Sequence, residues 1–345
     1  MRYSKIVIAN LLLSCAAALA NGSNRTTQGS IGFALGNRRV NGDCKSQADY
    51  ELDLEALAQE SAGRIVRTYA AAECETAAKL LPAASREGFQ IVLGIWLSDE
   101  QAWAADKASM AELVPQFREE VYGVTVGSET LYRDEISAQD LLLKIEEIRD
   151  LLPTVKRVGT ADTWNIFVDG TADPVLEGNV SLVLANNFPF WQPESPPVQS
   201  FRSEVSRVTR YIEQKRQSLR LPAVEIWIGE TGWPTDGGSD KGRAIASTDF
   251  ADYYFHDGIC AQTNKGTNIF VFEALDEPWK PSVMGIDESH WGVFNLIWRG
   301  GIGCALLFDF FLDPAAPNEW TLYQEAILWR TGTALFFQCL KASVD

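Results

Sequence analysis

Two glutamates follow short apolar segments that end in similar ways. Glu129 closes the segment 122–129 (Tyr-Gly-Val-Thr-Val-Gly-Ser-Glu), and Glu230 closes the segment 225–230 (Glu-Ile-Trp-Ile-Gly-Glu). A carboxyl group at the end of a buried strand loses water, which raises its pKa and suits it to proton transfer. One such glutamate is more often an exposed side chain or a helix cap. Two such glutamates, each close to a glycine at the end of its segment, favour a catalytic pair.

A pair of carboxyl groups can break a glycosidic bond. When they lie about 5–5.5 Å apart, one attacks the anomeric carbon while the other protonates the leaving oxygen. Rival chemistries have little support, because His256 and His290 are the only histidines. No cysteine or histidine cluster has metal-ligand spacing, and no glycine-rich phosphate motif is present. We therefore expect carboxylate chemistry with no metal and no organic cofactor.

Eight short apolar or β-branched segments alternate with helical patterns along the chain. The apolar segments lie at 31–35, 64–69, 90–96, 122–129, 157–160, 182–186, 225–230 and 268–273. Stripes spaced i, i+4, i+7 predict helices between them, with Tyr50, Leu54, Leu57 and Ala58; Leu141, Ile145, Ile148 and Leu152; and Phe201, Val205, Val208 and Ile212. This order predicts a single-domain (β/α)₈ TIM barrel, with a doubly wound sheet as the alternative. The carboxyl ends of barrel strands meet at one face, so Glu129 and Glu230 would come together there.

Two local patterns refine this prediction. Ser137, with Asp140 three residues later, is typical of a helix N-terminus. The segment 192–199 is rich in proline and serine and predicts a loop rather than a domain boundary.

Tryptophans are frequent near the predicted strand ends. Of the 11 in the chain, six lie at or just after predicted strand ends: Trp96, Trp164, Trp191, Trp233, Trp279 and Trp291. Indole faces can stack on the apolar faces of sugar rings, although a single tryptophan more often belongs to the core. Their concentration at one end of a barrel favours a carbohydrate ligand.

The N-terminal segment has the pattern of a signal peptide. Arg2 and Lys5 precede an apolar run that ends in Ala-Leu-Ala at 18–20. The run is too short for a membrane helix, and no later segment supplies about 20 apolar residues. We therefore expect a mature protein from residue 21 that is secreted, with no membrane insertion and a location outside the cell or in its wall.

Charge and cysteines agree with this expectation. The chain has a formal charge of −16, which becomes −18 without residues 1–20, so nucleic acids are poor partners and a neutral polysaccharide is not excluded. Five cysteines remain, which leaves at least one free thiol, and Cys44 and Cys74 could form a bridge. Asn24 and Asn179 begin glycosylation sequons, so we expect a glycoprotein.

Seven segments carry a resemblance to a known family. They are 31–36 with 42–45, 66–70, 124–129, 185–191, 229–234 (Gly-Glu-Thr-Gly-Trp-Pro), 272–280 (Phe-Glu-Ala-Leu-Asp-Glu-Pro-Trp-Lys) and 291–294. In this order they resemble glycoside hydrolase family 17, in particular the secreted fungal cell-wall branch of β-1,3-glucanases and β-1,3-glucanosyltransferases.

The resemblance implies a TIM barrel, retention of configuration and a β-1,3-glucan substrate. It implies that Glu129 is the acid/base and Glu230 the nucleophile. Glu277, Lys280 and Glu288 match a charged cluster near the family's active site, which could instead be a salt-bridge network that only orients a loop. The substrate-binding residues that we expect are Tyr69, Trp96, Trp164, Asn186, Phe188, Trp191, Trp233, Glu273, Glu277, Lys280 and Glu288.

The chain departs from the family in two places. Many relatives have asparagine before the acid/base, where its amide can hold the sugar 2-hydroxyl, whereas this chain has Ser128. After Asn295 the sequence no longer resembles the family. We therefore divide the chain into a signal peptide (1–20), a catalytic domain (21–296) and an atypical tail (297–345).

Three functions fit these observations. The first is a β-1,3-glucan hydrolase or glucanosyltransferase, which share their first chemical step. The second is a non-catalytic cell-wall glucan-binding barrel, and the third is a related glycosidase of β-1,4-linked polymers. The two glutamates favour an enzyme, and the segments 230–234 and 277–280 favour the β-1,3 linkage.

Overall fold

A computed structural model describes residues 28–192, 195–237, 244–280, 282–283 and 286–294. Eight parallel strands form a closed barrel in the order of the sequence, because β8 pairs with β1 as well as with β7. The barrel strands are β1 (Ile31–Ala34), β2 (Ile65–Arg67), β3 (Gln90–Ile95), β4 (Val121–Ser128), β5 (Val158–Thr163), β6 (Leu182–Asn186), β7 (Glu225–Thr231) and β8 (Asn268–Val271). The TIM-barrel prediction is confirmed, and the doubly wound alternative is excluded by closure.

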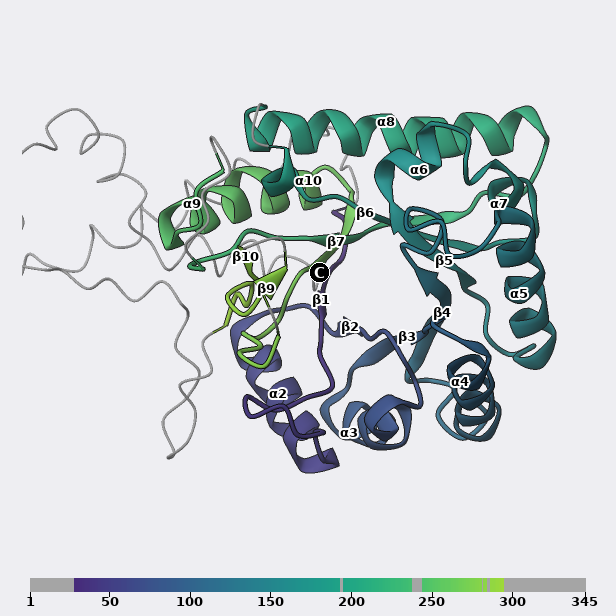
Figure 1. The fold of residues 1–345 in the computed structure, drawn as a ribbon, viewed down its shortest axis with the longest axis horizontal. Helices are drawn as coiled ribbons and strands as arrows, with labels where there is room; N and C mark the ends of the chain where they lie inside the picture. Colours follow the sequence, from purple (N-terminus) through teal and green to yellow (C-terminus); the bar gives the residue numbers. More distant parts are fainter. Residues whose placement is uncertain (1–27, 193–194, 238–243, 281, 284–285, 295–345) are drawn as a thin grey trace, which may run out of the picture.

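Helices surround the barrel (Figure 1). They are α2 (Gln47–Glu60), α3 (Thr76–Glu87), α4 (Glu100–Leu113), α5 (Ala138–Leu151), α6 (Trp164–Val168), α7 (Asp173–Glu177), α8 (Pro197–Ser218), α9 (Thr248–Tyr253) and α10 (Ala261–Thr263), with short helical turns η2 (Glu73–Glu75), η3 (Pro189–Trp191) and η4 (Tyr254–Cys260). The three predicted apolar stripes lie on α2, α5 and α8. Residues 192–199 are not wholly a loop, since α8 already begins at Pro197, where a proline is tolerated in the first helical turn.

The hydrophobic core has two parts. A small cluster comes only from strand residues and fills the barrel interior, with Trp227 stacked on Phe270 at 4.5 Å between ring centroids. A larger cluster joins the strands to the helices, and it contains the stripe residues Tyr50, Leu141 and Phe201. Both parts hold the carboxyl ends of the strands in fixed positions.

Local contacts stabilise the elements that lead to the strand ends. Ser137 caps α5 as predicted, because its side chain accepts a hydrogen bond from the Asp140 N–H. Cys44 and Cys74 form a disulfide, which confirms that these two cysteines can pair, and it joins the loop after β1 to the loop after β2.

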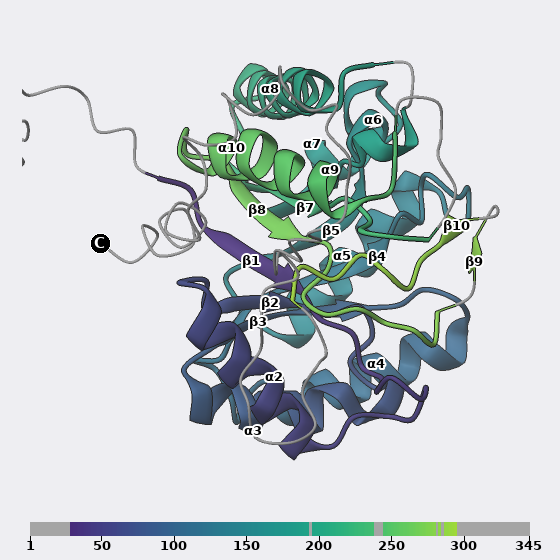
Figure 2. The ribbon, with the colours of Figure 1, turned by 90° about the vertical axis from the view of Figure 1, so that its left-hand side faces the viewer.

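A two-stranded antiparallel hairpin follows β8. It consists of β9 (Ser282–Val283) and β10 (Ile286–Asp287), and it lies on the side of the barrel toward which β1 runs (Figure 2). This hairpin was not predicted from the sequence. The predicted signal peptide, Asn24, Cys304, Cys339 and the tail lie outside the described residues.

The described residues contain neither a candidate membrane span nor a candidate metal site. No helix in this part of the chain has the length and hydropathy needed to cross a membrane. Within the same residues, histidine, cysteine, aspartate and glutamate side chains form no cluster able to hold a metal ion.

Candidate active site

Glu129 and Glu230 lie at the carboxyl ends of β4 and β7. Glu230 is inside β7 and only 7% exposed. Glu129 follows β4 directly and has a left-handed backbone with φ of 58°, after Gly127 at 77°. These conformations bend the chain at the strand end, and the Glu129 N–H donates to the Ala161 carbonyl of β5 at 2.9 Å. The bend turns the chain away from the strand direction at the position where Glu129 emerges.

Arg67, the last residue of β2, contacts both β4 and β7, the strands that lead to the two glutamates. Its side chain is 1% exposed, and Nη1 lies 3.0 Å from Glu230 Oε1. The same nitrogen donates to the Gly229 carbonyl at 2.8 Å, and Nη2 donates to Ser128 Oγ at 3.1 Å. A buried guanidinium with these partners orients the Glu230 carboxylate and compensates its charge.

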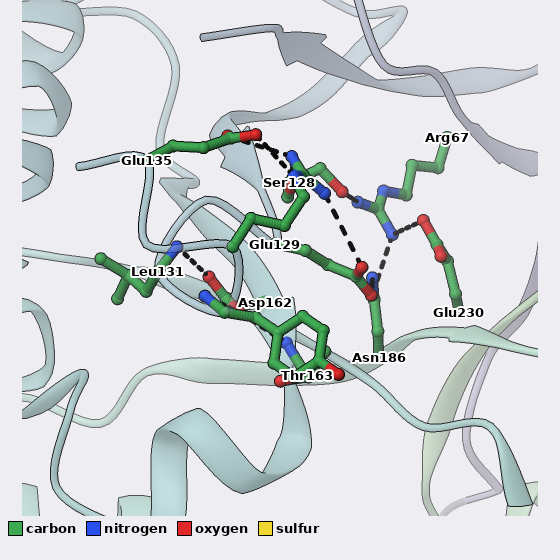
Figure 3. A network of polar contacts seen from close by, with 11 residues as sticks. Arg67, Ser128, Glu129, Leu131, Glu135, Asp162, Thr163, Asn186 and Glu230 are labelled. Atoms are coloured by element: carbon green, nitrogen blue, oxygen red, sulfur yellow. Dashed lines mark hydrogen bonds and ion pairs between the residues drawn. The ribbon is translucent and has the colours of Figure 1, made fainter. Parts of the chain in front are cut away.

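Asn186, at the end of β6, lies between the two carboxylates (Figure 3). Its Nδ2 donates to Glu129 Oε1 at 2.9 Å, while its Oδ1 accepts from Arg67 Nη1 at 3.2 Å. The contacts therefore run from Glu129 through Asn186 and Arg67 to Glu230. The structure brings together the two glutamates that the sequence predicted as a catalytic pair.

Arg133 supports Glu129 from the loop after β4. Its Nη2 donates to the Ser128 carbonyl at 2.6 Å, and its Nη1 lies 3.8 Å from Glu129 Oε2. Its guanidinium also contacts the ring of Trp96, 5.2 Å from the centroid, and pairs with Glu135. Glu129 is thus partly exposed but held by an amide and a cation.

The Glu230 carboxyl is poised between its two protonation states. Burial raises the pKa of Glu230 to about 7, Arg67 opposes this increase, and the charge of Glu129 adds to it. Burial and then the charge of Glu230 raise the pKa of the neighbouring Tyr69 hydroxyl well above its usual value. Tyr69 therefore stays protonated next to Glu230, and its ring lies 5.0 Å from the Arg67 guanidinium.

We expect Glu230→Gln to stabilise the folded chain at neutral pH. The folded pKa of about 7 lies above the usual 4.5, so the folded state holds this proton more tightly than the unfolded state. Wild-type stability is therefore highest below pH 4.5 with respect to this group, and it declines as the pH rises through 7. The glutamine variant should gain up to about 3 kcal/mol over wild type at pH 8 and almost nothing at pH 4. Urea unfolding at both pH values measures this, and an equal difference at both would contradict it.

A second charged cluster lies beyond β8. Lys280 Nζ is 2.6 Å from Glu273 Oε2 and 2.7 Å from Glu277 Oε2, and all three residues belong to the segment 272–280. Burial and the charge of Glu277 raise the pKa of Glu273 well above its usual value. Burial acts to lower the pKa of Lys280, but the two carboxylates outweigh it and raise the pKa. The loop after β1 approaches closely here, since a Cβ on Gly36 would lie 1.5 Å from Glu277 Oε1.

This cluster is electrostatically coupled to Glu129 and Glu230. The charge of Lys280 favours the ionised form of Glu230. Glu288, after β10, is half-buried, and burial and the charge of Glu129 raise its pKa while Lys280 opposes this. Lys280 pairs with Glu273 and Glu277, and its charge acts on the pKa of Glu230 and of Glu288.

The predicted aromatic residues divide into two groups. Trp96, Trp164, Phe188 and Trp191 are partly exposed near strand ends. Trp233 is only 5% exposed, its ring packs on Phe190 at 5.1 Å, and its Nε1 donates to the Ile245 carbonyl at 2.8 Å. Trp291 is also buried and stacks on Trp191 at 6.2 Å. Trp233 and Trp291 therefore support the surface at the strand ends and leave little area for a sugar.

Three residues of the site, Arg67, Arg133 and Asp162, were not predicted from the sequence. Arg67 ends the segment Ile-Val-Arg, and an arginine inside an otherwise apolar strand indicates a buried ion pair. No comparable signal marks Arg133 or Asp162, because their roles depend on the fold of the loop after β4.

Comparisons with known proteins identify the family of this chain. The BtgE/BtgC glycoside hydrolase domain matches residues 32–292. The chain is 42% identical to a glucan 1,3-beta-glucosidase of Arthroderma benhamiae, with 86% of this chain and 94% of that protein covered. It is 37% identical to a glucan 1,3-beta-glucosidase of Saccharomyces cerevisiae, with 86% and 96% covered.

Solved structures show the same fold. A glycoside hydrolase family 17 β-1,3-glucanosyltransferase from Rhizomucor miehei superposes with a TM-score of 0.65 at 26% identity, over 79% of this chain and 94% of that chain. An active-site mutant of the Rhizomucor miehei β-1,3-glucanosyltransferase in complex with laminaritriose also has a TM-score of 0.65, at 25% identity over 77% and 93%. The chain therefore belongs to glycoside hydrolase family 17, in the fungal branch that the BtgE/BtgC glycoside hydrolase domain describes.

Proposed function

We propose that this glycoside hydrolase acts on β-1,3-glucan by a retaining double displacement, with Glu230 as the nucleophile and Glu129 as the acid/base. The observation that supports it best is the asymmetry of the two carboxyl groups. Glu230 is buried against a fixed arginine at 3.0 Å, whereas Glu129 is more exposed and bonded to a neutral amide at 2.9 Å. The fixed, charge-compensated group suits attack, and the accessible group suits proton exchange.

In the first step, a Glu230 carboxylate oxygen forms a bond to the anomeric carbon of the glucosyl unit. The bond from that carbon to the leaving oxygen breaks, and Glu129 gives its proton to this oxygen. In the second step, Glu129 takes a proton from water or from a sugar hydroxyl, whose oxygen attacks the anomeric carbon and releases Glu230 as a carboxylate. Water gives hydrolysis and a glucan hydroxyl gives transfer, depending on how well the site excludes water.

Asn186 supports binding of the reacting sugar in place of the missing asparagine before the acid/base. Ser128 Oγ accepts a hydrogen bond from Arg67. The Asn186 amide lies within contact of Glu129 and Arg67, close to both catalytic groups. We therefore propose that the Asn186 amide contacts the sugar 2-hydroxyl. Tyr69, Glu273, Lys280 and the partly exposed aromatic residues complete the proposed binding surface.

The proposed site of action is outside the cell, in the cell wall. The Cys44–Cys74 disulfide supports an oxidising compartment, and Asn179 of the second sequon is exposed. Both features agree with the signal peptide expected from the sequence.

Reduced laminarioligosaccharides test the activity directly. The chain from residue 21 is incubated with them, and products are followed by mass. Shorter products alone indicate hydrolysis, and longer ones in addition indicate transfer. A folded protein that binds these oligosaccharides without product would overturn the proposed activity in favour of a glucan-binding barrel, and cleavage of cellulose or mannan instead would overturn the linkage.

Arg67→Met should shift the pH dependence of activity. The Arg67 cation favours the ionised form of Glu230, so its loss raises the pKa of Glu230 above about 7. Because the nucleophile must be ionised, activity increases with pH through this pKa. The acidic limb of kcat/KM should therefore move to higher pH by about one unit or more, with a large loss of activity at pH 6. Arg67→Lys, which keeps a charge, should shift the limb less.

Arg216→Met is the matched control. Arg216 is also buried, but it donates to the backbone carbonyls of Leu176, Gly178 and Pro222, which precede β6 and β7 and lie away from the carboxyl ends of the strands. Its loss should lower the melting temperature and leave the acidic limb where it is. If the acidic side of the pH profile of kcat/KM is unchanged in Arg67→Met, Arg67 does not set the ionisation of Glu230.

A further inference from the structure

Asp162 is a buried carboxylate that the proposed reaction does not use. It lies on β5, is 0% exposed, and each of its oxygens accepts a backbone hydrogen bond. Oδ2 accepts from the Leu131 N–H at 2.9 Å. Oδ1 accepts from the Thr163 N–H at 2.8 Å and from the Tyr132 N–H at 3.3 Å. Figure 3 shows this carboxylate under the turn that follows Glu129.

These hydrogen bonds attach the turn after β4 to the neighbouring strand. The Glu129 N–H already donates to the carbonyl of Ala161, the residue before Asp162. Within the turn, the Arg133 N–H donates to the Glu129 carbonyl at 3.0 Å. The turn therefore has β5 contacts at Glu129, Leu131 and Tyr132, and two of these three depend on the Asp162 side chain.

Glu129 requires such support because of its backbone. A left-handed conformation at a residue other than glycine costs free energy and persists only where the surroundings fix it. Without the Asp162 carboxylate, the Leu131 N–H and Tyr132 N–H would lose their acceptors, and the turn could relax. The Glu129 carboxyl would then move relative to Asn186 and to the leaving oxygen.

A charged acceptor at this place is costly, which argues for more than loop capping. Burial raises the pKa of Asp162 to about 6, its backbone donors oppose this, and the charge of Glu129 raises it further. Among the described residues, no lysine or arginine nitrogen lies within 4.0 Å of it. Arg133 acts on it only from a greater distance.

We propose that Asp162 is the positioning residue of the acid/base: its two oxygens hold the 129–132 turn so that the Glu129 carboxyl reaches the leaving oxygen. This rests on the proposed function, in which Glu129 donates the proton. Asp162 touches neither the substrate nor the reacting atoms. Removal of the Asp162 carboxylate should therefore weaken proton donation by Glu129 and leave the attack by Glu230 intact.

The dependence of rate on the leaving group tests this role. Reduced laminarihexaose has an alcohol leaving group that needs a proton, whereas 2,4-dinitrophenyl β-laminaribioside has a leaving group that departs without one. Asp162→Asn keeps the size of the side chain but replaces one acceptor oxygen by a donor. We expect kcat/KM to fall by about 10- to 100-fold with the hexaose and by less than about 3-fold with the aryl glycoside.

Asp106→Asn is the matched control. Asp106 is a similarly buried carboxylate. It accepts hydrogen bonds from the Ala72 N–H at 2.7 Å, in the loop after β2, and from the Trp96 N–H at 2.9 Å, directly after β3. It has no contact with the 129–132 turn. Its substitution should lower the melting temperature as much as Asp162→Asn does, with any rate loss equal for both substrates.

Glu129→Ala, measured in parallel, separates this inference from the proposed function. If Glu129→Ala shows no difference between the two substrates, the acid/base assignment itself fails. If Glu129→Ala shows the difference and Asp162→Asn loses rate equally on both substrates, Asp162 only holds the fold and the inference is overturned. The same conclusion follows if a folded Asp162→Asn keeps wild-type rates on both.

Discussion

Glu230→Gly is expected to lose almost all activity on β-1,3-glucan, on the order of 10⁴-fold or more in kcat, as for other removed nucleophiles. Without the carboxylate, nothing attacks the anomeric carbon from the face opposite the leaving oxygen. Added azide can occupy the space beside Arg67 and attack that carbon in one displacement. The product should be an α-glycosyl azide, inverted relative to the substrate. Proton NMR of the products formed from 2,4-dinitrophenyl β-laminaribioside measures this.

Glu225→Gln is the control for Glu230→Gly. Glu225 begins the same strand, β7, and its carboxylate accepts hydrogen bonds from Arg157, Trp227 and Tyr122 at the opposite end of the barrel. Its substitution should reduce stability without changing the product. A β-glycosyl azide from Glu230→Gly would contradict the nucleophile assignment.

Glu129→Ala should lose about 10²- to 10⁴-fold in kcat/KM on laminarihexaose, the usual contribution of a general acid. The first step needs no proton when the leaving group is dinitrophenolate, so a glycosyl-enzyme should form with that substrate and accumulate. Azide attacks this intermediate without base assistance, and the product should be a β-glycosyl azide with retained configuration. The two variants therefore give azides of opposite configuration, which distinguishes the two roles.

Glu135→Ala is the matched control for Glu129→Ala. Glu135 also pairs with Arg133, with Oε1 at 2.6 Å from Nε, but it is exposed on the loop. It should keep activity within a few-fold of wild type and form no azide product. If Glu129→Ala gave the inverted azide, the acid/base assignment would be wrong.

The eight strands and the positions of the two glutamates at strand ends were predictable because their signals are local. Each strand carries its own apolar segment, and each glutamate follows such a segment directly. The order of alternating strands and helices then restricts the topology to few folds. Closure was not predictable from alternation, since it depends on the pairing of β8 with β1 across the whole chain.

The supporting residues were harder to predict because their partners are distant in sequence. Arg67 and Glu230 are separated by 163 residues. Asp162 acts through backbone N–H groups, which any residue except proline provides, so no side-chain pattern marks its partners. The aromatic residues show a related difficulty. Trp191 and Trp233 both follow strand ends and both pack on Phe190, but only Trp233 is also covered by Phe250 and Tyr254.

Closure of the barrel also determines when activity can arise during synthesis. Arg67 comes from β2, Glu129 from β4, Glu230 from β7 and Lys280 from the loop after β8, and β8 completes the ring by pairing with β1. Before β8 leaves the ribosome, the nascent chain has unpaired edges at β1 and β7. It also lacks Lys280. We therefore expect a chain that ends before β8 to be inactive, because it can neither close the barrel nor supply Lys280.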